Sequence, residues 1–208
     1  LSIGIQNYLC ILNSEGRFKK VLFDNDMLKS SRVFSIAKLK NSSKIIDSFI
    51  YSNENKLIIL TSIGRIFKFD LSNKTLAPNT KQSQGLLLVN LLPNEKVVSC
   101  CKSKNEDTIY LISKKAKIFK LRIDEIYNSH LSKLGYVNNK IQLKNDSFIK
   151  LVSKNQSLDI ETNKNKSARL NFEKLASSSN KNTIKIDFFN LEGDEYLENC
   201  FRLENFIN

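Results

Sequence analysis

Several residue types are scarce in this chain of 208 residues, and each scarcity excludes a kind of site or structure. One histidine, His130, and no Cys-x-x-Cys spacing argue against a zinc site. We expect the four cysteines to be reduced core thiols: Cys10, Cys100, Cys101 and Cys200. The sequence has no apolar run of about 18 residues and no charged-then-apolar leader, which predicts a cytoplasmic protein without a membrane span or secretory signal.

Proline and glycine are also few, with two and six residues respectively. Many turns must therefore be made by asparagine, aspartate, serine and lysine. Asparagine and aspartate tolerate positive φ and bond their own backbone, so they can occupy turn positions that glycine would otherwise take.

A repeat is the main positive feature of the sequence. Four times, an apolar strand reaches a tight turn and is followed by a basic, aromatic strand. The turns lie at Gly16, Gly64, Ala116 and Asn165, in the segments YLCILNSEGRFKKVLF, KLIILTSIGRIFKFDL, TIYLISKKAKIFKLRI and SLDIETNKNKSARLNF. A period of about 40 to 50 residues predicts a propeller or a related array, in which each unit buries its apolar face against its neighbours.

Each copy also has a second half, in which a recurring turn precedes a short apolar strand. The turns are Leu39-Lys40-Asn41, Leu92-Pro93-Asn94-Glu95, Leu143-Lys144-Asn145-Asp146 and Leu191-Glu192-Gly193-Asp194. The strands begin at Ile45-Ile46, Val97-Val98, Phe148-Ile149 and Tyr196-Leu197. We therefore predict an all-β fold in one domain, 1–208, with about four strands in each of the repeats 1–53, 54–105, 106–154 and 155–205.

The net charge of +12 is unevenly distributed. Residues 1–184 contain 31 Lys and Arg against 15 Asp and Glu, whereas residues 185–208 contain 2 against 6. An excess of this size favours attraction to a polyanion, of which nucleic acid is the commonest in a cytoplasm. The acidic end could compete for such a surface, but an ordinary solvated face is the simpler interpretation.

The basic residues recur in register with the turn, one and four residues after it. Because the units repeat around one axis, we interpret this as a stripe that follows phosphates; the alternative is that lysines protect strand edges from aggregation. The residues predicted to contact DNA are Arg17, Lys19, Lys20, Arg65, Lys68, Lys117, Lys120, Lys166 and Arg169.

Apolar residues of the same strands alternate along one face. This alternation predicts core packing rather than base stacking. The two clearest sets are Phe67, Phe69 and Leu71, and Phe119, Leu121 and Ile123.

With both half-motifs in place, the chain resembles the carboxy-terminal domain of the A subunit of type IIA topoisomerases, DNA gyrase and topoisomerase IV. The best-matching stretch is 56–101, with LTSIGRIFKFDL followed by Gly85 and LLLVNLLPNEKVV, and Gly135 followed by KIQLKNDSFIKLV is nearly as similar. The Gln-Arg-Arg-Gly-Gly-Lys-Gly heptapeptide of gyrase is absent. The parent enzyme is therefore left open between a gyrase with that loop in another blade and a topoisomerase IV-like or divergent paralogue.

The resemblance implies a β-pinwheel: about four four-stranded blades of a five- or six-bladed domain, with strands exchanged between neighbours. It also implies that duplex DNA wraps around a basic perimeter without sequence specificity, and that this controls DNA topology. The implied partners are the N-terminal cleavage domain of the same subunit and the ATPase subunit, near the nucleoid.

The sequence has none of the usual catalytic signatures. No tyrosine follows an arginine, as the nucleophile of this family does, and there is no glycine-rich phosphate loop. Asp124-Glu125 and Asp194-Glu195 are interpreted as solvated surface. We therefore expect a fragment that is not itself an enzyme and needs no cofactor. Two alternatives remain, a propeller used as a protein-interaction scaffold and an RNA-binding β module.

Overall fold

The computed structural model describes part of the chain. The described residues are 7–23, 29, 35–37, 39, 43–51, 56–72, 74–129, 135–137, 141, 143–153, 157–172, 183–185 and 191–203. For 183–185, 202 and 203 only the backbone is described. Leu39 of the first predicted second-half turn is described, but Lys40 and Asn41 lie outside these residues, as does His130.

The described residues form four small antiparallel sheets, which we call blades 1 to 4. In each blade a hairpin pairs with a later, inner strand. Blade 1 contains β1 (Tyr8–Asn13), β2 (Arg17–Leu22) and the inner strand β3 (Ile45–Tyr51). Blade 2 contains β4 (Lys56–Thr61), β5 (Ile66–Asp70) and the inner strand β7 (Val97–Ser103). Blade 3 contains β8 (Thr108–Ser113), β9 (Lys117–Arg122) and β10 (Phe148–Ser153), and a 3-10 turn, η1 (Ile123–Glu125), follows β9. Blade 4 contains β11 (Ser157–Thr162), β12 (Ser167–Asn171) and β14 (Leu197–Leu203).

The blades exchange strands with their neighbours. β6 (Leu86–Leu87) lies between β5 and β7 in the sequence, yet it pairs with β2 of blade 1. Likewise β13 (Thr183–Lys185) lies between β12 and β14 but pairs with β9 of blade 3. In blade 2 the exchanged strand is reduced to one bridge, between Ile66 and Tyr136. The connection of each following blade therefore completes the sheet before it.

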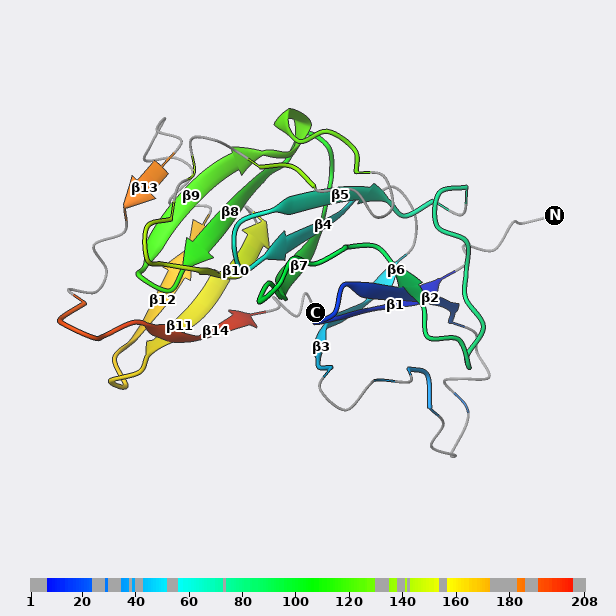
Figure 1. The fold of residues 1–208 in the computed structure, drawn as a ribbon, viewed down its shortest axis with the longest axis horizontal. Coiled ribbons are helices and arrows are strands. Elements are labelled where there is room, and N and C mark those ends of the chain that lie inside the picture. The colour runs from blue at the N-terminus through cyan, green and yellow to red at the C-terminus, as the bar shows by residue number, and fades with distance from the viewer. Residues whose placement is uncertain are drawn as a thin grey trace.

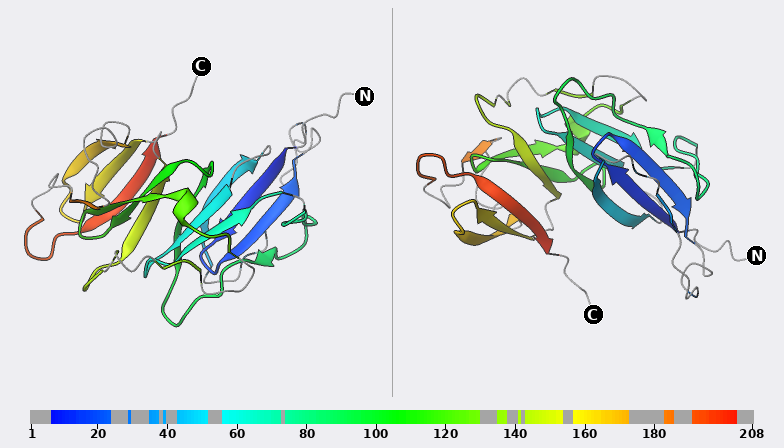
Figure 2. Two further views of the ribbon diagram at one scale, coloured as in Figure 1. Left: turned by 90° about the horizontal axis from the view of Figure 1, so that it is seen from above. Right: turned by 60° about the horizontal axis from the view of Figure 1, so that its bottom comes forward.

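Figure 1 shows the sheets following one another along an arc, from β1 in blue through green β8 to red β14. Figure 2 shows the same blades as successive layers rather than as one continuous sheet. Within the described residues, no helix is long and apolar enough to cross a membrane.

The predicted hairpin turn has the same backbone geometry in all four blades. Gly16, Gly64, Ala116 and Asn165 all have positive φ, between 57° and 91°. A Cβ on Gly64 would lie 2.7 Å from the Phe148 ring, so this position requires glycine for space as well as for conformation. The second turn is also left-handed in the three blades where it is described, at Asn94, Asn145 and Gly193.

Three hydrophobic cores lie between successive blades, because each strand alternates between its two neighbours. In β4, Leu57 and Ile59 pack into the core with blade 1, whereas Ile58 and Leu60 pack into the core with blade 3. The predicted core sets are confirmed. Phe67, Phe69 and Leu71 belong to the first core, and Phe119, Leu121 and Ile123 to the second.

Blade 4 differs from the inner blades on one face. Its Leu158 and Ile160 pack against blade 3. The face of blade 3 that packs against blade 4 carries Tyr110, Ile112 and Ile118. The equivalent face of blade 4 points away from blade 3. At the corresponding positions, counted from the hairpin turn, blade 4 has polar residues: Asp159, Glu161 and Ser167. The outward face of blade 4 is therefore mainly polar, with one exposed aromatic residue, Phe201, opposite Asp159.

Candidate nucleic-acid interface

The hairpin turn is held by the last residue of the first strand. Its side-chain oxygen accepts the main-chain N–H of the first basic residue after the turn, over 2.8 to 3.3 Å, in every blade. The accepting residues are Asn13, Thr61, Ser113 and Thr162. A short polar side chain at this position stabilises the left-handed turn and sets where the basic strand starts.

The two sets of repeated basic residues do not form one stripe. Residues one and four positions after the turn are three apart in a strand, and side chains of a strand alternate between faces. Arg65 therefore projects from the same face as Phe67, whereas Lys68 projects from the face of Ile66. The prediction of a single stripe is wrong in this respect.

Lys20, four residues after its turn, is buried, with 1% of its surface exposed. Its Nζ donates to the carbonyl oxygens of Leu71, at 2.5 Å, and Leu76, at 3.2 Å. The amine also lies 4.6 Å from the ring centre of Tyr8 and 5.1 Å from that of Tyr51. Burial lowers the pKa of Lys20. This cation connects blade 1 to the chain that follows β5.

Lys68 makes the equivalent connection one blade later. It is buried, and its Nζ donates to the carbonyl oxygen of Ile123 at 3.1 Å and to Oδ1 of Asn105 at 3.2 Å. Leu71 and Ile123 each directly follow the basic strand of the next blade. The recurring lysine at this position therefore joins consecutive blades, and burial lowers the pKa of Lys68 as well.

The remaining residues of this set are more accessible. Lys120 is half-buried in β9. Arg169 is exposed and forms a two-pronged pair with Asp159, at 2.7 Å from Nε and 3.0 Å from Nη2. Asp159 occupies a position that is apolar in the inner blades, and the pair belongs to the polar outward face of blade 4.

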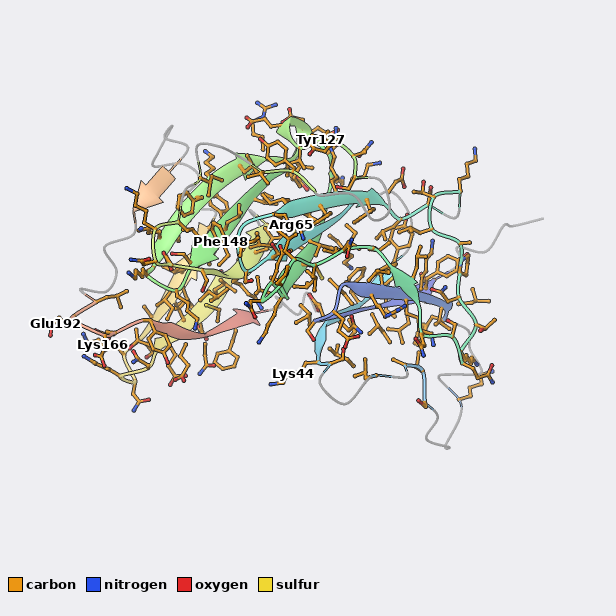
Figure 3. All side chains as sticks on the ribbon, viewed as in Figure 1. Lys44, Arg65, Tyr127, Phe148, Lys166 and Glu192 are labelled. Carbon is orange, nitrogen blue, oxygen red and sulfur yellow. The ribbon has the colours of Figure 1, made fainter. Side chains whose placement is uncertain are left out.

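Of the residues that directly follow the turn, Arg65 is buried and paired. Its Nε donates to Oε1 of Glu95 at 2.8 Å, and Nη2 donates to the second oxygen and to the carbonyl of Asn90. Only 5% of the Arg65 side chain and 1% of the Glu95 side chain are exposed. Burial raises the pKa of Glu95, but hydrogen bonds from Arg65 and the Leu92 N–H outweigh it, so the pKa is lowered overall. Figure 3 shows Arg65 amid the sheets.

Lys166 forms the equivalent pair in blade 4, with Nζ 2.9 Å from Oε2 of Glu195. The carboxylate is fully buried, while the lysine side chain remains 45% exposed. The hydrogen bond from Lys166 is the largest cause of the lowered pKa of Glu195. Figure 3 shows Lys166 at the margin of blade 4, close to Glu192.

The other three predicted residues differ in access. Lys19 is buried and donates to the carbonyl oxygens of Lys81, at 2.5 Å, and Ser83, at 2.7 Å. Arg17 is half-buried and donates to Gly85 O over 3.4 Å. Lys117 is half-buried. Four of the nine predicted residues are thus buried, and their charged groups bond within the protein: Lys19, Lys20, Arg65 and Lys68.

Counting only basic residues missed the carboxylates that neutralise them. Glu95 and Glu195 each lie two residues before the inner strand of their blade, and each accepts an N–H three residues earlier, at Leu92 or Glu192. The structure therefore aligns Leu92 with Glu192, whereas the sequence repeat aligned Leu92 with Leu191. The second turn of the fourth copy is shifted by one residue from the predicted alignment. A glutamate at this spacing from the strand was the available signal.

Two further features concern ligands. No group of three or more His, Cys, Asp and Glu residues that could hold a metal occurs among the residues that the structure describes. A hollow of about 640 Å³ lies where β3, β7 and β10 converge, with Ile46, Val98 and Ile149 on its lining and Lys44 and Lys96 beside them. Its lining is mainly apolar.

The four antiparallel sheets, with recurring left-handed turns and with blades 1 to 3 each joined to a segment of the blade that follows, define a β-pinwheel. The fold is that of carboxy-terminal domains of type IIA topoisomerase A subunits, as comparison with solved structures shows. The chain is similar to the C-terminal domain of DNA topoisomerase IV, with a TM-score of 0.68 and 17% identity over 83% of this chain and 54% of that one. The chain thus spans about half the length of that structure.

Two other solved structures share the fold. The E. coli ParC C-terminal domain matches with a TM-score of 0.58 and 14% identity, over 95% of this chain and 80% of that one. The DNA gyrase A C-terminal domain matches with a TM-score of 0.55 and 13% identity, over 97% and 84%. No family model matches the sequence, and no curated protein matches it. Identities this low establish the fold alone.

Proposed function

We propose that this chain binds and wraps duplex DNA without sequence specificity, as the C-terminal domain of a type IIA topoisomerase A subunit of gyrase or topoisomerase IV type. The observation that carries the proposal is the shared strand-exchanged pinwheel, which matches a topoisomerase IV C-terminal domain at a TM-score of 0.68. The net charge of +12 also favours binding of a polyanion such as DNA.

Because several of the predicted basic residues are buried, fewer of them can contact DNA phosphates. Lys19, Lys20, Arg65 and Lys68 hold the blades together, so we assign phosphate contacts to the predicted residues that reach solvent. These are Arg17, Lys117, Lys120, Lys166 and Arg169. Backbone contacts of this kind position DNA and leave sequence preference to its deformability.

The domain would act within a larger enzyme. Its partners would be the N-terminal cleavage domain of the same subunit and the ATPase subunit, in the cytoplasm at the nucleoid. The wrapped segment would bias strand passage there, while DNA cleavage and ATP hydrolysis would belong to those other parts.

A topology assay tests wrapping directly. Nicked plasmid is incubated with the chain, sealed with ligase and freed of protein. We expect a shift in linking number that grows with protein concentration, and binding whose logarithm falls with log salt at a slope of about −0.9 per phosphate contact. Binding without such a shift would contradict wrapping. Preference for single-stranded RNA would support the RNA-binding alternative, and affinity no greater than that of any basic protein would support the scaffold alternative.

A further inference from the structure

Every blade brings its hairpin turn and its second turn together. The main-chain N–H of the first turn residue donates to a carbonyl just before the inner strand, over 2.8 to 3.1 Å. The four donor and acceptor pairs are Ser14 and Lys44, Ser62 and Lys96, Lys114 and Ser147, and Asn163 and Tyr196. Side chains of the two turns therefore gather at one end of each blade, and their charges can be compared blade by blade.

In blades 2 and 4 carboxylates of the second turn neutralise the cations at this end. Glu95 pairs with Arg65 in blade 2. In blade 4, Lys166 pairs with Glu195, and Lys164 lies 3.1 Å from Asp194. The one other cation at these two turn ends is Lys96 of blade 2, which is exposed and for which no ion pair is found among the described residues.

Blade 3 is different. Its two turns contribute Lys114, Lys115, Lys117 and Lys144, which we call the blade 3 lysine cluster. Lys114, Lys115 and Lys144 are exposed, and Lys117 is half-buried. Among the described residues, no acidic side chain forms an ion pair with any of them.

The carboxylate available in blade 3 is Asp146, which lies two residues before the inner strand, as Glu95 does. It is one methylene shorter than glutamate. Its Oδ1 accepts the main-chain N–H groups of Lys115, at 3.1 Å, and Ser147, at 2.8 Å, and so binds its own turns rather than Lys117. The cluster therefore carries four positive charges against one negative charge.

One member of the cluster is positioned by the next blade. Nζ of Lys114 lies 5.0 Å from the ring centre of Tyr196, which directly precedes β14. This contact holds the amine at the seam between blades 3 and 4. Like charges gathered at one end of a blade repel one another, and an anionic DNA backbone would relieve the repulsion while releasing counterions.

We propose that the blade 3 lysine cluster is the main phosphate-contacting site of this domain, and that duplex DNA crosses the array at the turn end of blade 3. This inference rests on the proposed DNA-binding function and gives it a location. The turn ends of blades 2 and 4 contribute less, because all of their cations except Lys96 already have carboxylate partners.

The test compares two variants with equal loss of charge. One carries Lys115→Gln and Lys144→Gln, within the cluster. The control carries Lys74→Gln and Lys104→Gln, two exposed lysines that follow β5 and β7, at the other end of the strands. Binding of a duplex of about 40 base pairs is measured by fluorescence anisotropy across a salt series, after circular dichroism has verified that both variants are folded.

The cluster variant is expected to weaken binding roughly tenfold or more at about 0.1 M salt and to reduce the steepness of the salt dependence by about 1.8. The control is expected to change affinity by less than about threefold, through the overall field alone. Equal losses in both variants would overturn the location but leave DNA binding intact. Failure of the unmodified chain to bind duplex DNA more tightly than a basic peptide of equal charge would overturn the proposed function itself.

Discussion

A lysine amine that leaves water must find acceptors within the protein, and Lys20 and Lys68 find them in the neighbouring blade. Both donate to the main-chain carbonyl that follows the next basic strand, at Leu71 and Ile123. A charged hydrogen bond to a carbonyl is stronger than a neutral one, which offsets part of the cost of burial. The repeated lysine is thus explained by packing between blades.

Replacing Lys20 with methionine separates this structural role from DNA binding. Lys20→Met keeps the length of the side chain but leaves the buried carbonyls of Leu71 and Leu76 without their donor. We expect a loss of about 1–3 kcal/mol in the free energy of unfolding, measured by urea denaturation, with unchanged DNA affinity below the transition. Lys74→Met, at an exposed position, is the control and should be nearly neutral. A large fall in affinity for folded Lys20→Met would return this residue to the DNA-contact set.

The Cys10 thiol predicts a pH dependence of stability. Burial is the main cause that raises its pKa from 9.0 to about 12. Between these values the unfolded chain has lost the thiol proton while the folded chain keeps it, so stability falls as pH rises. One such group contributes a slope of up to about 1.4 kcal/mol per pH unit.

The measurement is urea denaturation between pH 8 and pH 11 for the wild type and for Cys10→Ala. The variant is less stable below about pH 9 because a core contact is lost, but the difference between the two chains should shrink as pH rises above about 9. A difference that stays constant with pH would show that the thiol ionises equally in both states.

At the scale of elements, the left-handed turn residue is the feature on which each hairpin depends. Glycine occupies it in blades 1 and 2, alanine in blade 3 and asparagine in blade 4. A left-handed conformation costs an ordinary L-residue roughly 1–2 kcal/mol, and glycine avoids this cost. Equivalent turns with different residues therefore offer a matched comparison.

Opposite substitutions at equivalent turns should have opposite effects. Gly64→Ala should destabilise by about 2 kcal/mol or more, because its Cβ would meet the Phe148 ring at 2.7 Å in addition to the backbone cost. Ala116→Gly, where φ is +57°, should be neutral or stabilise by up to about 1 kcal/mol. Thermal denaturation monitored by circular dichroism measures both. Similar destabilisation by the two substitutions would show that the turn conformation is not limiting.

The edges of blades 1, 2 and 3 also depend on an exchanged segment. Main-chain bonds at β6, Tyr136 and β13 connect a blade to the segment that follows its neighbour's hairpin. A blade in this array is therefore not an independent folding unit, and the predicted repeat 54–105 contributes β6 to the sheet of blade 1. Loss of one hairpin should weaken the preceding sheet as well as its own.

At the scale of the whole molecule, the positive charge that a ligand can reach depends on which basic side chains have carboxylate partners, and not on their number along the sequence alone. The basic excess of residues 1–184 remains available to a ligand where carboxylates do not pair with the cations, as at the turn end of blade 3, where Asp146 binds main-chain N–H groups instead. In blade 4, Asp194 and Glu195 neutralise Lys164 and Lys166. The acidic end of the chain thus limits the positive surface at one end of the array.

Removing one of these carboxylates should extend that surface. Asp194→Asn removes the ion-pair partner of Lys164, whose Nζ keeps its hydrogen bond to the carbonyl oxygen of Glu192. Since the side chains are exposed, 44% for Lys164 and 89% for Asp194, stability should change by less than about 1 kcal/mol. We expect tighter DNA binding and a salt dependence steeper by up to about 0.9. Glu106→Gln, at an exposed turn before β8, controls for net charge. An equal gain in the control would show that only the overall charge matters.

The sequence predicted much of this fold because its signals are local. Turn residues recur at Gly16, Gly64, Ala116 and Asn165, and alternation along β5 and β9 identifies the core faces. The sequence was less informative about which basic residues are available to contact DNA. The same periodicity that marks Lys20 and Lys68 as repeated cannot distinguish a repeated surface charge from a repeated buried hydrogen bond.

The amino-acid sequence by itself determined the hairpins, their left-handed turns and the all-β repeat, since these depend on residues close together in the chain. Only the tertiary structure decided which segment completes each sheet and which cations remain in water. Both depend on contacts between segments that are distant in the sequence, either in a neighbouring blade, as for Lys68 and Ile123, or in the second turn of the same blade, as for Arg65 and Glu95. Lys68 is buried where the chain after β9 offers it a carbonyl, whereas Lys115 lies exposed in the hairpin turn of blade 3.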